Sequence, residues 1–136
     1  MRQKIIGMDP DDIVNMDQTP IPYSYHSNRT LKKKGVKTIH VRLSTADTKR
    51  ATLAATVTAS GKLLKPMLIF KGQANGRIER SEFQTYPENC VYAMQPKAWM
   101  DEKMMHTWID DVLIPWKQTR NPVIIPLLTL DADRLH

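Results

Sequence analysis

The sequence predicts an α/β domain built on a mixed sheet, in which a meander of strands is followed by a crossover helix and a parallel central strand. Two observations carry this prediction. Runs typical of strands recur through residues 13–94, and the long amphipathic stretch after Asp101 is followed by the apolar run "PVIIPLLTLD". A strand that follows a crossover helix can return parallel to the first strand, and such connections are right-handed in nearly all known cases.

The first predicted strand is short. Residues 13–16 are largely apolar and lead to Asp17, and the "QTPIP" that follows contains Pro20 and Pro22. Proline lacks the N–H that a central strand must donate, so we expect a buried strand that runs into a loop. Further along, "TIHVRLS" alternates apolar and polar residues and predicts a strand with one buried face over residues 38–44.

A hairpin and a helix complete the expected elements. The two β-rich runs within residues 51–72 flank Ser60-Gly61-Lys62, where glycine can adopt the positive φ of a turn. We expect an exposed connection over 71–90 and a brief strand over 91–94. Asp101 can cap a helix whose apolar residues form one stripe, and Pro115 should stop or kink that helix within about a turn. The stripe consists of Met104, Met105, Trp108, Ile109, Val112 and Leu113.

Positive charge is concentrated in one segment. Residues 28–50 carry eight basic residues against one acidic residue, whereas the whole chain has a net charge of +6. Clustered lysine and arginine favour a polyanion, because each contact with a phosphate releases condensed counterions. The alternative is a solvated surface loop. No apolar run approaches the ~20 residues of a membrane helix, and the single cysteine excludes an internal disulfide.

Two aspartates are candidates for a metal site. If the strand ending at Asp131 lies parallel to the strand ending at Asp17, both carboxylates reach one crevice at the sheet edge. Paired carboxylates repel each other unless a cation lies between them, and Mg²⁺ prefers such oxygen ligands together with waters and phosphates. The alternative is that both residues cap turns or helices, as aspartate often does at strand ends.

Five segments, taken in order, resemble the catalytic domain of DDE superfamily endonucleases of the pogo/Tigger transposase type. They are "IVNMDQTP", "GVKTIHVRLS", "KRATLAATVTASGKLLKPMLIFKG", "WMDEKMMHTWIDDVLIPW" and "LLTLDADRLH". The resemblance spans residues 13–136, with residues 1–12 as a lead-in. It implies an RNase H-like fold and metal-dependent cleavage and transfer of DNA strands.

The resemblance also assigns roles to residues. It implies that Asp17 and Asp131 are the first two catalytic acids and that they bind Mg²⁺ or Mn²⁺. The family's third acid lies beyond a further strand, and Asp133 is too close to Asp131 to replace it. We therefore expect a domain that is incomplete at its C-terminus, binds metal weakly and is inactive as an enzyme alone.

Partners follow from the same resemblance. We expect the phosphates of DNA transposon ends to contact the basic residues Arg29, Lys32, Lys33, Lys34 and Lys37. A nuclear location and a homo-oligomer or partner that covers the exposed sheet edge are further expectations. The alternatives are a domesticated, non-catalytic DNA-binding or interaction module and a decayed transposon remnant. The "LDAD" stretch also resembles the haloacid dehalogenase motif, but that motif opens its domain.

Overall fold

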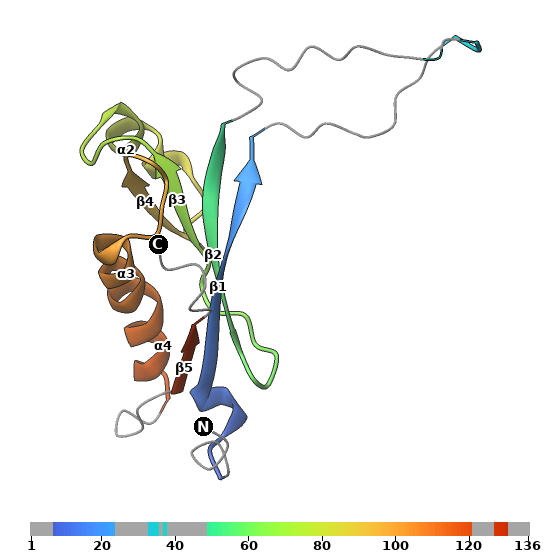
Figure 1. Ribbon diagram of the computed structural model, residues 1–136. Helices are drawn as coiled ribbons and strands as arrows, with labels where there is room; N and C mark the ends of the chain where they lie inside the picture. The colour runs from blue at the N-terminus through green and yellow to red at the C-terminus, as the bar shows by residue number, and fades with distance from the viewer. Residues whose placement is uncertain (1–6, 24–32, 36, 38–48, 121–126, 131–136) are drawn as a thin grey trace.

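The computed structural model describes residues 7–23, 33–35, 37, 49–120 and 127–130, and for residues 127 and 130 the backbone only. Its centre is a mixed sheet of five described strands in the order β4-β3-β2-β1-β5 (Figure 1). The strands are β1 (Ile13–Pro22), β2 (Arg50–Thr58), β3 (Met67–Lys71), β4 (Val91–Gln95) and β5 (Leu127–Leu130). β1–β2 and β2–β3 pair antiparallel, whereas β3–β4 and β1–β5 pair parallel.

The antiparallel hairpin lies where the sequence predicts it. Gly61 adopts a φ of +88°, which a side chain would disfavour, and its N–H donates to the carbonyl of Thr58 (2.9 Å). β2 and β3 then pair from Ala54–Met67 to Thr52–Ile69. β4 confirms the brief strand expected near residue 91. The strand expected over residues 38–44 lies outside the described residues.

β1 is longer than expected, and the prediction of a loop at its two prolines is wrong. The N–H of Tyr23 donates to Lys49 and the carbonyl of Ile13 accepts from Ala59, so odd-numbered residues of β1 bond to β2. The even-numbered Pro20 and Pro22 therefore turn their missing N–H to the other side, past the described end of β5. A proline is tolerated in a strand at such an unpaired position.

The crossover helix packs on one face of the sheet. It consists of α3 (Glu102–Trp108), the π-helical turn η4 (Ile109–Leu113) and α4 (Ile114–Gln118), and Asp101 caps it by accepting from the N–H of Met104 (2.9 Å). The helix ends at Gln118, within a turn of Pro115, as predicted. The wider π-helical turn directly before Pro115 relieves the clash that a proline ring causes in an α-helix.

The predicted apolar stripe of the helix forms the core. Met104, Trp108 and Val112 are buried against a sheet face that carries Val14, Met16, Ala54, Met67 and Ile69. Lys103, His106, Asp110 and Asp111 are exposed. In the part of the chain that the structure describes, no helix is both long and apolar enough to cross a membrane.

The opposite face carries an aromatic cluster near β3 and β4. Two short helices that the sequence does not predict, α2 (Arg77–Ser81) and η3 (Phe83–Thr85), bring residues of the connection back to the sheet. Neighbouring ring centroids in the cluster lie 5.1–6.4 Å apart, a range in which aromatic contacts stabilise. The cluster consists of Tyr23, Phe70, Phe83, Tyr86 and Tyr92.

Candidate functional site

β1 and β5 lie side by side as the acid-pair hypothesis requires. They run parallel, in register from Ile13–Leu127 to Met16–Leu130. Asn15 fixes this register, because its side-chain amide donates to the hydroxyl of Thr129 (2.9 Å) and to the Thr129 carbonyl (3.2 Å). The Thr129 hydroxyl in turn reaches the carbonyl of Val14 (3.3 Å). Where the sequence suggests a central strand, β5 is the outermost of the described strands.

Asp17 lies within β1 and not at its end. It pairs with Ala55 of β2 and is exposed on the face that carries Asn15, because side chains two apart in a strand share a face. One of its carboxylate oxygens accepts from the N–H of Gln18 (2.7 Å). Asp131, which follows the last residue of β5, lies outside the described residues. Within the described ranges, no three His, Cys, Asp or Glu side chains are grouped closely enough to hold a metal.

The predicted basic segment is only partly described. Lys33, Lys34 and Lys37 are exposed, whereas Arg29 and Lys32 lie outside the described residues. The end of β1 and the start of β2, which flank this segment, are joined by a hydrogen bond. The N–H of Tyr23 donates to the carbonyl of Lys49 (3.0 Å). The segment therefore leaves and rejoins the sheet at one place.

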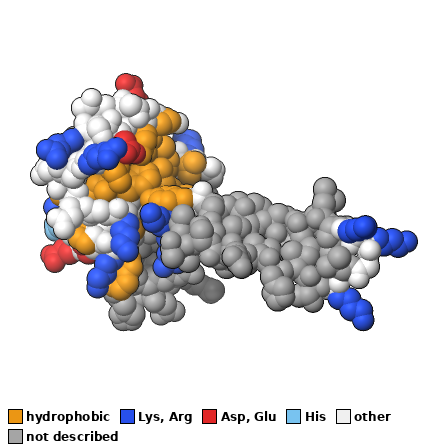
Figure 2. All heavy atoms as spheres, turned by 90° about the horizontal axis from the view of Figure 1, so that it is seen from above, with side chains coloured by type: hydrophobic (Ala, Val, Ile, Leu, Met, Phe, Trp, Pro, Cys, Tyr) orange, Lys and Arg blue, Asp and Glu red, His pale blue; other side chains and the backbone are white. Residues whose placement is uncertain are grey.

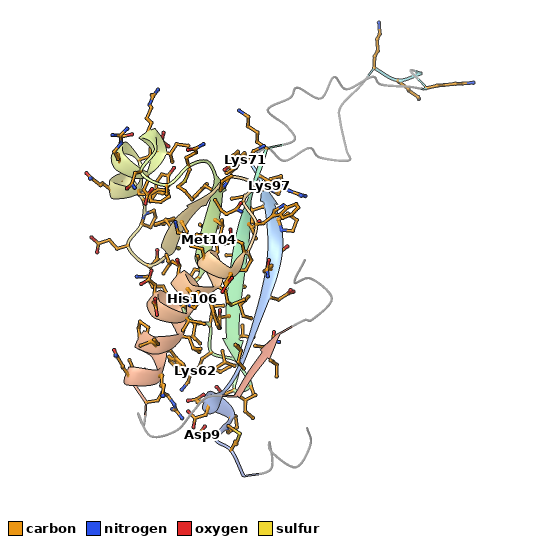
Figure 3. All side chains as sticks on the ribbon, turned by 60° about the vertical axis from the view of Figure 1, so that its left-hand side comes forward. Asp9, Lys62, Lys71, Lys97, Met104 and His106 are labelled. Atoms are coloured by element: carbon orange, nitrogen blue, oxygen red, sulfur yellow. The ribbon has the colours of Figure 1, made fainter. Side chains whose placement is uncertain are left out.

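A second group of acids, which the sequence analysis did not identify, lies at the other end of β1. Asp9, Asp11 and Asp12 surround Arg120, whose guanidinium nitrogens contact all three carboxylates at 2.9–3.1 Å. Asp11 also binds Lys62 and the Ser60 hydroxyl. We call these six residues the Arg120 clamp. Figure 3 shows Asp9 and Lys62 at one end of the sheet and Lys97 at the other.

Charge pairing in the Arg120 clamp shifts several pKa values. Hydrogen bonds from Lys62 and then Ser60 lower the pKa of Asp11, and the backbone N–H of Asp11 followed by Arg120 lowers the pKa of Asp9. Hydrogen bonds to Asp12 and Asp9 raise the pKa of Arg120. These acids are thus neutralised by cations of the chain itself. Their chemistry is that of a structural ion network and not that of a metal site.

The fold and the β1–β5 pair define an α/β domain of the RNase H-like kind, with a mixed sheet and a crossover helix on one face. The chain belongs to the DDE superfamily endonuclease family, whose model matches residues 48–136. A search of curated proteins and one of solved structures found no match.

Family membership gives the coarse chemistry. DDE endonuclease domains act on DNA, and they typically use divalent metal ions. The matched stretch contains Asp131, whereas Asp17 and the basic residues 29–37 precede it. The role of Asp17 therefore depends on the geometry of β1 and on the resemblance of "IVNMDQTP" alone.

Proposed function

We propose that this chain is a nucleic-acid-binding part of the catalytic domain of a pogo/Tigger-type transposase, in which Asp17 and Asp131 bind Mg²⁺ or Mn²⁺ and residues 29–37 hold DNA phosphates. The observation that carries the proposal is the parallel register of β1 and β5 in a chain of the DDE family. Asn15 and Thr129 are opposite each other in this register, Asp17 lies two residues after Asn15 in β1, and Asp131 follows Thr129 by two residues in the sequence, which supports the proposal.

The proposed site divides the chemistry between metal and protein. Divalent ions held by carboxylates supply an activated water and stabilise the leaving oxygen of a phosphodiester displacement. The carboxylate of Asp17 is exposed and already oriented by the N–H of Gln18, so it can receive an ion without unfolding its strand. A transposase acts on chromosomal DNA, and the proposed location is therefore the nucleus.

Metal binding tests the acid pair. We expect Asp17→Asn and Asp131→Asn each to weaken Mn²⁺ binding by about tenfold or more, because a direct ligand should matter at least as much as an outer-shell partner. Titration followed by electron paramagnetic resonance of free Mn²⁺ measures this. Asp110→Asn, which removes an exposed carboxylate on η4, serves as the matched control. Equal Mn²⁺ affinity in wild type and Asp17→Asn would refute the assignment.

The salt dependence of DNA binding tests the basic segment. If Lys33 and Lys34 contact phosphates, replacing both with glutamine should reduce the slope of log K against log salt by about 1.8, at about 0.9 per contact on duplex DNA. The control is the double replacement of Lys65 and Lys103, which are exposed elsewhere. Identical slopes for the wild type and the Lys33/Lys34 variant would show that these lysines are merely solvated.

A further inference from the structure

A pocket of about 270 Å³ opens near the end of the sheet where β1 stops and β2 starts. It lies between residues 18–20 of β1, the first residues of β2 and the loop that joins β4 to α3. Its walls include the side chains of Arg50, Lys97 and Trp99, and none of the described lining residues is acidic. Gln18 of β1 also lines it, on the face of the strand opposite to that of the Asp17 side chain.

Trp99 is an exposed aromatic residue in this loop. Its side chain is 52% exposed, whereas Trp108 in the core is 0% exposed. The Nζ atom of Lys97 lies 5.0 Å from the centre of the Trp99 ring, within the range of a cation–π contact. An indole surface and a positive charge are therefore presented together.

The loop that carries Trp99 is held firmly. The side-chain oxygen of Gln95 accepts from the N–H groups of Lys97 (2.6 Å) and Trp99 (3.0 Å), and its amide donates to Asp101 (3.0 Å). This ties the loop to the residue that caps α3. Trp99 is thus positioned by its backbone and not by burial of its ring.

Ala98 adds a second constraint. It adopts a left-handed φ of +58°, which is unfavourable for a residue other than glycine, and its carbonyl accepts from the Thr52 hydroxyl (2.6 Å). Such backbone strain persists only where surrounding contacts enforce it, and it is common at ligand clamps. The loop is therefore preorganised before any ligand arrives.

Charge and shape together indicate the ligand. Figure 2, which views the molecule from above, shows hydrophobic side chains with Lys, Arg and some acidic side chains around them. Figure 3 places Lys71 near Lys97 at this end of the sheet. A π surface beside cations suits an unpaired nucleotide, since bases stack on aromatic rings and phosphates bind lysine and arginine. The volume lies just below the usual range of ligand pockets and suits one nucleotide better than a duplex.

We infer that this pocket binds an unpaired nucleotide of the bound DNA, with its base on Trp99 and its phosphate on Arg50 and Lys97. The inference rests on the proposed function and extends it, because it assigns a site for single-stranded DNA to residues outside the metal site and outside residues 29–37. It predicts a preference for single-stranded over blunt duplex DNA that depends on Trp99.

Fluorescence anisotropy with the full chain and a labelled ten-residue oligothymidylate tests the inference. We expect Trp99→Ala to weaken binding by about tenfold or more, and Trp99→Phe to retain most of the affinity. Binding to a blunt hairpin duplex of equal phosphate number should change little. Lys97→Ala should reduce the salt slope for the oligothymidylate by about 0.7, whereas Lys65→Ala should not. Trp116→Phe is the control for an indole elsewhere, and urea midpoints verify folding.

Several results would overturn the inference. Unchanged oligothymidylate binding by Trp99→Ala would do so, as would an equal loss on hairpin and single strand. Displacement of the oligothymidylate by a poly-glutamate peptide of equal charge would identify a general anion site or a peptide site. If Mn²⁺ binding depends on Asp17 and hairpin DNA binds normally while Trp99→Ala has no effect, this inference alone fails. If wild type binds no DNA of either kind, the proposed function fails with it.

Discussion

Replacing Trp108 with alanine should lower the free energy of unfolding by about 3–5 kcal/mol, the usual effect of removing a large buried aromatic. Trp108 is 0% exposed and lies at the centre of the contact between α3 and the sheet. Its indole N–H donates to the hydroxyl of Thr56 (2.9 Å), which is itself fully buried on β2. The substitution therefore leaves both a cavity and a hydroxyl without its partner.

Urea denaturation measures this loss, and two comparisons separate its causes. Trp99→Ala makes the same chemical change at an exposed ring and should alter stability by about 0.5 kcal/mol or less. Thr56→Val keeps the volume of the core but leaves the indole N–H unpaired, which should cost about 1–3 kcal/mol. A Trp108→Ala variant as stable as Trp99→Ala would contradict the central position of Trp108.

Local periodicity explains which parts of the fold are predictable from sequence. The stripe through Met104, Trp108 and Val112 repeats every four residues, so the order of residues alone identifies the buried face of the helix. The β2–β3 hairpin is equally evident, because alternation and a turn glycine coincide around Gly61. Both features depend on residues that are neighbours in the chain.

Features that depend on distant contacts are not predictable in this way. The direction of each N–H in β1 decides that Pro20 is tolerated, and that direction follows from the register with β2. The short helix η3 packs against Phe70 and Tyr92 through the ring of Phe83, in contacts that no local pattern encodes. The exposure of Trp99 likewise follows from a loop geometry set by Gln95 and Thr52.

The candidate site likewise has one feature that the sequence predicts and one that it does not. Topological reasoning correctly predicts that β5 returns parallel beside β1, since a crossover helix precedes it. The hydrogen bond between the side chains of Asn15 and Thr129 joins residues 114 positions apart, and no sequence motif indicates it. The pairing of Asp17 with Asp131 remains a prediction that the metal titration tests.

The Arg120 clamp should make the stability of the domain sensitive to acid, and removing Arg120 should reduce that sensitivity. Asp9 and Asp11 have pKa values below the ordinary 3.8, so the folded state binds their protons less readily than the unfolded state does. The stabilisation is therefore complete above the unfolded pKa and is lost as the pH falls through the folded values. We expect the urea midpoint of wild type to drop steadily below about pH 4.

Arg120→Met keeps the aliphatic stem and removes the charge that contacts three carboxylates, two of which, Asp11 and Asp12, are largely buried. At pH 7 the variant should unfold at a clearly lower urea concentration, because carboxylates without a cation repel each other. As the pH falls through the lowered pKa values of Asp9 and Asp11, these carboxyls take up protons, and the gap between variant and wild type should narrow. Lys62→Met should act more weakly at pH 7, since Lys62 contacts Asp11 alone of the three. If the difference in urea midpoint between the variant and wild type stays constant between pH 7 and 2.5, Arg120 stabilises the fold through packing of its aliphatic stem. Charge would then not be what holds the end of α4 to the start of β1.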